Sequence, residues 1–306
     1  MSLGSMLGAR LAMRAYPSEM RWTPGGESGD IEDRRGDSGG GGGFSLLGGR
    51  SLGLVGTLVV LGLSLVFHQN FFALLGGGTQ DQSRSAQASA PVQSTPAQDK
   101  QVQFVSFVID DVQSSWSRAL PNAGVQYQHA KLVLFRNGIR SGCGFAESTA
   151  GPFYCPADRK VYLDLGFFDE LRGRFGAPGE FAEAYVIAHE VGHHVQNLLG
   201  IESKMQRARE AHPEQANALS VRLELQADCF AGVWGHSTEQ RNLLEKGDVE
   251  SGLAAAAAVG DDRLQKQATG QVHPESWTHG SSQQRVEWFN RGFKSGNIDE
   301  CNTFAQ

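Results

Sequence analysis

The chain has 306 residues, enough for one large domain or two small ones, with 27 lysines and arginines against 33 acidic residues. The net charge of -6 and the pI near 5.9 exclude the strongly basic surface by which many proteins bind nucleic acid. Four cysteines are too few for a fold held together mainly by disulfides, although they suffice for two bridges.

The first fifty residues are rich in glycine, serine and arginine, and they include the run Gly39–Gly43. A segment with so few large apolar residues cannot bury a core, so residues 1–50 are predicted to form a disordered tail. A short docking motif at Trp22–Gly26 is an alternative, but a solvated tail accounts better for the composition.

Residues 51–80 contain no aspartate, glutamate, lysine or arginine. Leu52–Phe67 is apolar all round, and together with Phe71–Leu75 it is long enough to cross a bilayer core of about 30 Å. We therefore predict one transmembrane helix over residues 51–75. A buried helix of a soluble domain is the alternative, but the segment has no amphipathic stripe and lies between two polar stretches.

The charges around this apolar segment predict its orientation. Arg34, Arg35 and Arg50 precede it, so the positive-inside rule places the tail in the cytoplasm and the main domain outside it. Ala88–Ala90 resembles a signal-peptidase site but lies about twenty residues beyond the apolar core, which favours a retained signal anchor. The polar residues 76–100, rich in serine, glutamine, alanine and proline, are predicted to be a flexible linker.

From Gln101 onwards the composition is that of a folded domain, and residues 101–306 are long enough for a single core. Alternation and β-branched residues predict strands, whereas spacing of three to four residues predicts helices. The expected elements are a helical segment over Val112–Leu120, strands over Lys131–Phe135 and Lys160–Leu165, a turn at Arg136–Gly138, and a short helix over Phe167–Leu171.

The four cysteines are expected to pair in this domain. Cys143 and Cys155 lie twelve residues apart around turn-forming residues, and export of the domain would favour a disulfide between them. A second metal site is the alternative, but neither a C-x-x-C spacing nor a nearby histidine supports it. By elimination, Cys229 and Cys301 would form the other bridge.

The strongest motif is His189-Glu190-Val191-Gly192-His193, an H-E-x-x-H sequence within the helically spaced run Ala184–Gly200. In a helix the two histidines lie on one face, where they can bind one zinc ion. Glu190 then stands beside the metal as the base for its bound water. The alternative is a core helix that happens to carry two histidines.

A catalytic zinc site needs a third protein ligand and leaves a fourth position to water. If Pro213–His236 is a helix, Glu224 and Asp228 are four residues apart on one face. We assign Glu224 as the third ligand and Asp228 as the acceptor of a hydrogen bond from a zinc-binding histidine, which orients that ring. An exposed amphipathic helix with two acidic residues is the alternative.

A later segment offers a further candidate. His279–Ser282 is predicted to be a loop and N-cap, followed by a helix over Gln283–Phe293 that carries Arg285. A hydrolase needs a donor for the oxyanion that forms on the attacked carbonyl, and His279 is the candidate donor. Arg285 is expected to fix a carboxylate or loop nearby. A structural histidine that bridges helix ends is an equally good interpretation of His279.

These motifs resemble the neutral zinc metallopeptidase family of bacteria, within the broader gluzincin group of H-E-x-x-H enzymes. The resemblance covers Gln101–Phe304, and it includes the E-x-x-x-D helix with Glu224 and a T-H-x-x-x-x-x-R loop. It implies a membrane-tethered or exported protein whose zinc is bound by two histidines and a glutamate, but it implies no particular substrate. Its densest matches are Cys143–Ala146, Gly151–Asp158, Val161–Asp164, Gly176–Gly200, Glu224–Gly232 and His279–Phe289.

The sequence thus predicts an α+β fold, a zincin-like metallopeptidase domain with a small sheet, an H-E-x-x-H helix and a mostly helical C-terminal half. The predicted function is a Zn²⁺-dependent endopeptidase acting on peptides or proteins, single-pass in the bacterial inner membrane, with its domain on the extracytoplasmic side. A strand from Lys131–Ala146 is expected to offer its edge to an extended substrate. Two alternatives stay open, a non-catalytic zinc-stabilised envelope adaptor or chaperone-like protein, and a zinc amidase acting on peptidoglycan.

Overall fold

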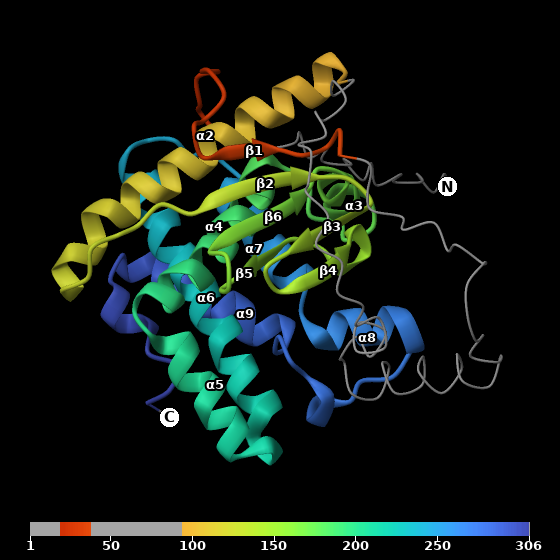
Figure 1. The fold of residues 1–306 in the computed structure, drawn as a ribbon, viewed down its shortest axis with the longest axis vertical. Coiled ribbons are helices and arrows are strands. Elements are labelled where there is room, and N and C mark those ends of the chain that lie inside the picture. Colours follow the sequence, from red (N-terminus) through yellow and green to blue (C-terminus); the bar gives the residue numbers. More distant parts are fainter. Residues whose placement is uncertain (1–18, 38–93, 306) are drawn as a thin grey trace, which may run out of the picture. The chain divides into compact units, whose positions relative to one another are not determined.

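A four-stranded sheet and a set of helices make up the part of the chain that the computed structural model describes, residues 19–37 and 94–305 (Figure 1). The strand order is β1-β2-β6-β5; β1 and β6 run parallel to β2, and β5 runs antiparallel to β6. A separate antiparallel hairpin joins β3 to β4. The strands are β1 (Ile31–Asp33), β2 (Lys131–Phe135), β3 (Gly138–Ser141), β4 (Gly144–Glu147), β5 (Phe153–Cys155) and β6 (Lys160–Asp164).

The helices make up most of the second half of the chain. They are α2 (Pro96–Ala119), α3 (Gly166–Gly173), α4 (Glu180–Leu198), α5 (Ile201–Ala211), α6 (Ala216–Gln240), α7 (Asp248–Ala258), α8 (Asp261–Thr269) and α9 (Ser282–Ser295). This mixed α+β fold with a small sheet agrees with the predicted fold class. The predicted transmembrane helix, residues 51–75, lies outside the described residues. Among the residues that are described, no helix is both long and apolar enough to cross a membrane.

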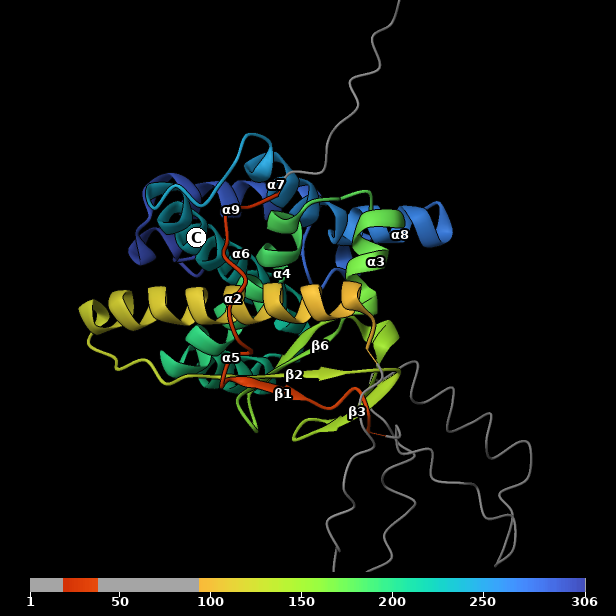
Figure 2. The same cartoon turned by 90° about the horizontal axis from the view of Figure 1, so that it is seen from above.

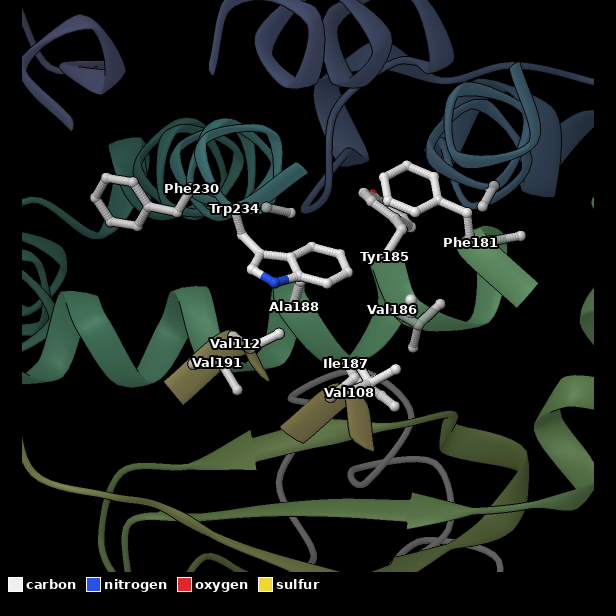
Figure 3. Close-up of a cluster of buried hydrophobic side chains, with 14 of the residues drawn as sticks. Val108, Val112, Phe181, Tyr185, Val186, Ile187, Ala188, Val191, Phe230 and Trp234 are labelled. Atoms are coloured by element: carbon white, nitrogen blue, oxygen red, sulfur yellow. The ribbon is translucent and has the colours of Figure 1, made fainter. Parts of the chain in front are cut away.

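Helix α4 lies at the centre of the hydrophobic core. Val108 and Val112 of α2 lie on the side of α4 that faces the sheet, while Phe230 and Trp234 of α6 lie on its opposite side (Figure 3). The ring of Phe181 stacks on that of Trp234, with 5.7 Å between centroids. Because α4 is surrounded by other elements, its position is determined by packing along most of its length, which suits a helix that must hold ligands.

Helices α6 and α9 approach each other closely enough for their backbones to touch. A Cβ atom on Gly292 of α9 would lie only 1.9 Å from the carbonyl oxygen of Cys229 on α6. A Cβ on Gly232 would similarly lie 2.1 Å from the carbonyl oxygen of Phe289. The Cys229–Cys301 disulfide joins α6 to the chain just after α9. This contact places Arg285 of α9 against the inner face of α6.

Replacing Gly292 with alanine should therefore lower the free energy of unfolding by about 3 kcal/mol or more, because the added methyl group forces the two helices apart. Urea denaturation measures this effect. Gly173→Ala in α3 is the control: a Cβ there meets nothing within 4 Å, so the change should not exceed about 1 kcal/mol. Equal stability losses in the two variants would mean that α6 and α9 are not in contact.

The N-terminal segment corrects one prediction. Residues 19–37 are not a disordered tail, because Ile31–Asp33 pairs with β2 and Trp22 packs on the ring of Phe104 at 5.3 Å between centroids. Met20 is only 4% exposed. This short segment cannot form a core alone, and it is stabilised by contacts with residues far along the chain. The average composition of residues 1–50 therefore concealed it.

The linker prediction also needs a correction at its C-terminal end. Helix α2 begins at Pro96, so residues 96–100 belong to the domain and not to the linker. Thr95 is the N-cap: its hydroxyl accepts from the Gln98 amide, and the Gln98 side chain accepts from the Thr95 amide. This capping box, followed by proline at the first position, is a helix-start signal that the low-complexity composition obscured.

Candidate metal centre

The two histidines of the H-E-x-x-H motif lie one turn apart on α4, as expected from their spacing. Gly200, in the left-handed conformation with φ 71°, follows the end of this helix. The rings of His189 and His193 are 4.8 Å apart between centroids and lie nearly perpendicular to each other. Both rings lie against α6, which carries Glu224.

The structure brings His189, His193 and Glu224 together, with one potential ligand atom from each residue within 4.8 Å of the others. Nε2 of His189 is 3.2 Å from Oε2 of Glu224, and Nε2 of His193 is 3.5 Å from Oε1. A tetrahedral zinc ion with bonds of about 2.0–2.1 Å separates neighbouring ligand atoms by roughly 3.3 Å. The two histidine–carboxylate distances are close to this separation, so the two imidazoles and the carboxylate can bind a zinc ion together.

Burial by itself would raise the pKa of the Glu224 carboxyl group. Attraction to His193 and the hydrogen bond with His189 outweigh this effect and hold that pKa well below its usual value. The carboxylate is thus ionised over the whole range in which a protein of this kind works, as a metal ligand must be.

Asp228 lies one turn beyond Glu224 on α6 and orients the first histidine. Its Oδ1 is 2.9 Å from Nδ1 of His189, which directs Nε2 of that ring toward Glu224. Arg285 donates to both oxygens of Asp228, from Nε at 2.8 Å and from Nη2 at 2.9 Å. The hydroxyl of Tyr185 donates to Oδ1 as well. The buried ion pair with Arg285 fixes the position of the Asp228 carboxylate, and this carboxylate orients the ring of His189.

Gln196, which was not among the predicted site residues, orients the second histidine in the same way. Its Oε1 lies 2.9 Å from Nδ1 of His193, and its Nε2 donates to the carbonyl oxygen of Leu223 at 2.7 Å. Gln196 follows His193 by three residues on the same helix, and this spacing is the signal that would have suggested it. Both ligand histidines thus have their Nδ1 atoms held by other side chains and their Nε2 atoms directed toward Glu224, where a metal would bind.

His279 lines the same cavity as Glu190 and is held by an aspartate that the sequence analysis also missed. Oδ2 of Asp261 accepts from the backbone amides of Thr278, His279 and Gly280 at 2.8, 2.6 and 3.0 Å. Its Oδ1 is 3.2 Å from Nδ1 of His279, and this hydrogen bond raises the pKa of the imidazole. In the sequence, Asp261 resembles an ordinary acidic residue in the first turn of a helix.

The cavity has a volume of about 580 Å³ and contains all three candidate ligands, Glu190 and His279. Residues 148–154, which lead into and include most of β5, form one of its walls. No residue of Lys131–Ala146 lines it within the described part of the chain, so the predicted substrate-binding edge is wrong. Strand β2 is flanked on both sides by β1 and β6, and the strand at the edge of the sheet beside the site is β5.

Comparisons with known proteins agree with the chemistry of this site. The sequence model of the family described as "Putative neutral zinc metallopeptidase" matches residues 20–304. "Uncharacterized protein YpfJ" of Escherichia coli K12 is 48% identical over 292 residues, which cover 94% of this chain and 99% of that protein. "Uncharacterized protein Rv2575" of Mycobacterium tuberculosis is 44% identical over 207 residues, 64% of this chain and 68% of that protein. No solved structure matches.

Proposed function

Since the chain belongs to the neutral zinc metallopeptidase family, we propose that it is a zinc-dependent endopeptidase of the glutamate-ligand type, the gluzincins. The observation that carries this proposal is the convergence of His189, His193 and Glu224 beside Glu190 in one cavity. Among the described residues this ligand group has three members, which leaves a coordination position for water. A purely structural zinc site would use a fourth protein ligand, so the adaptor alternative has less support.

When bound, zinc supplies a Lewis acid that polarises the scissile carbonyl and lowers the pKa of the attacking water. Glu190 takes the proton from that water as it attacks the carbonyl carbon, then delivers the proton to the leaving amine as the C–N bond breaks. His279 in its protonated form donates Nδ1–H to Asp261 and presents Nε2–H as a donor to the oxyanion that develops on the substrate. Asp228 and Arg285 position His189.

The edge strand β5 is the proposed binding site for the substrate backbone. In the described sheet it pairs with β6 on one side only, and Phe153 and Tyr154 line the cavity. An extended peptide can add to such an edge through main-chain hydrogen bonds, which place the scissile bond in register with the site. Main-chain recognition of this kind is tolerant of sequence, so specificity must come from the side-chain pockets.

One wall of the cavity is apolar, and it favours a large apolar side chain beside the scissile bond. Val186 precedes Glu190 by one helical turn and is 7% exposed, so it lies next to the proposed base. The rings of Phe167 and Phe175 lie 6.1 Å apart, and Val259 and Leu264 line the same cavity.

Replacing Phe167 with alanine should lower kcat/KM about tenfold for peptides with leucine or phenylalanine at the cleavage site, because the pocket loses apolar contact. Peptides with alanine there should be affected much less. Phe145→Ala is the control, since Phe145 is exposed on β4 and does not line the cavity. A uniform loss for all peptides would contradict an apolar specificity pocket.

We also propose that the domain works outside the cytoplasm, attached to the membrane through residues 51–75. The Cys143–Cys155 and Cys229–Cys301 disulfides support export, because such bridges persist in oxidising compartments.

The test of the proposed function uses the full chain in detergent, with zinc added or removed, against a broad peptide library. Mass spectrometry of the products identifies each cleaved bond. We expect internal peptide bonds to be cut only by the zinc-loaded protein. Zinc bound at one equivalent without cleavage of any peptide would favour the adaptor, and cleavage of peptidoglycan amides alone would favour the amidase.

A further inference from the structure

We propose that residues 19–37 and the domain of residues 94–305 lie on the same side of the membrane. A single-pass span with a cytoplasmic tail and an exported domain would separate these two parts of the chain. This inference concerns the topology of the chain and does not depend on peptidase activity.

The pairing of β1 with β2 is the first observation that places the two parts of the chain on one side of the membrane. Glu32 is in register with Val133, and the ladder continues with the Leu132 amide donating to the Asp30 carbonyl and the Arg34 amide to the Leu134 carbonyl, both at 2.8 Å. Such bonds require direct contact between the two strands. A hydrocarbon core of about 30 Å between the tail and the domain would make every one of them impossible.

Residues near the start of the segment, before the strand, also contact the domain. The Arg21 amide donates to the carbonyl of Leu243 at 2.8 Å, and the Arg21 side chain pairs with Glu245 in the connection between α6 and α7. The indole of Trp22 donates to Glu180 at the start of α4 at 2.9 Å.

Contacts with α2 continue along the rest of the segment. Gln113 donates to Asp30 at 2.9 Å, and the Ser28 hydroxyl donates to Asp110. Residues 20–33 thus contact α2, α4, β2 and the α6–α7 connection, and the family match begins at residue 20. The segment is therefore part of the domain.

Both ends of the intervening chain also emerge at one end of the domain. The red N-terminal segment and the orange start of α2 finish at the same end in both views (Figures 1 and 2). The pKa of the Arg35 guanidinium is raised by its hydrogen bond to Asp33, and Asp99 in the first turn of α2 adds to this effect. The chain therefore departs from the domain and rejoins it within electrostatic reach of one cluster of charges.

Single cysteines test the topology in the full chain in bacterial cells. Arg21→Cys and Glu245→Cys change residues whose side chains are 61% and 44% exposed, so neither should prevent folding. All four native cysteines are in disulfides and should not react. A membrane-impermeant maleimide applied to spheroplasts should label both single variants to the same extent. A short bis-maleimide should cross-link positions 21 and 245 in the double variant, which cleavage of the chain between them and gel electrophoresis would reveal.

The decisive contrary result is labelling of Glu245→Cys in intact spheroplasts while Arg21→Cys is labelled only after permeabilisation, with no cross-link in the double variant. That pattern would establish a single-pass anchor. Labelling of both only after permeabilisation would support the shared compartment but refute the proposed export of the domain. Mixing Arg21→Cys with Glu245→Cys chains distinguishes a strand donated by a second copy, since only an exchanged strand gives a linked dimer.

Discussion

Replacement of Glu190 with glutamine should abolish peptide hydrolysis and leave zinc binding near normal. The amide keeps the shape of the side chain but cannot take the proton from the attacking water. General-base catalysis contributes about a hundredfold to ten-thousandfold, so kcat should fall by about that factor. KM should change little, because the cleft and its apolar wall are unaltered. Steady-state kinetics and metal analysis of the same preparation measure both effects.

Glu170→Gln is the matched control for this variant. Glu170 also lines the cavity, but it is nearly half exposed and pairs with Arg174 on the surface of α3. Its replacement should leave kcat within about twofold of the original value, since a solvent-exposed ion pair contributes little. Wild-type activity in Glu190→Gln would remove Glu190 from the mechanism, and equal losses in both variants would indicate a general effect of charge in the cleft.

Replacement of Asp228 with alanine should weaken both the fold and the metal site. The change leaves the buried Arg285 without its partner, which typically costs about 3–5 kcal/mol in unfolding free energy. It also releases Nδ1 of His189, and the loss of such a partner commonly lowers metal affinity about tenfold to a hundredfold. Urea denaturation measures the first effect, and competition with a zinc chelator measures the second.

Two further variants separate these effects. Asp228→Asn retains an oxygen acceptor for His189 but loses the negative charge opposite Arg285. We therefore expect it to keep most of the zinc affinity that Asp228→Ala loses, but to lose much of the same unfolding free energy. Asp169→Ala removes one partner of an ion pair whose aspartate is 76% exposed, and it should change stability by less than about 1 kcal/mol. Unchanged zinc affinity in Asp228→Ala would mean that His189 is oriented by the helix alone.

The elements that were predicted well are those whose signal is local and long. Strand β2 begins and ends where the apolar run Lys131–Phe135 predicted it, and β6 differs from the prediction by one residue. The predicted N-cap region of α9 contains Ser281, which is the N-cap in the structure. Period, capping and turn chemistry are properties of neighbouring residues, so one sequence suffices to detect them.

Only some of the candidate metal ligands can be recognised from such a local signal. His189 and His193 are one helical turn apart, and their proximity follows from the helix itself. Glu224 is 31 positions beyond His193, and its selection depended on knowing what a zinc site requires. The packing of α6 against α4 is what places its carboxylate at 3.2 and 3.5 Å from the two rings.

The sequence by itself determined the helix with its two histidines, the chemistry of the ligand set and the bounds of strands β2 and β6 to within one residue. Only the tertiary structure decided that residues 19–37 belong to the domain, that β5 is the edge strand at the cleft, and that Asp261 holds His279. Each of these depends on contacts between elements that a periodic pattern does not encode. A three-residue strand such as β1 is stable only when β2 provides its hydrogen bonds, so no local signal could have revealed it.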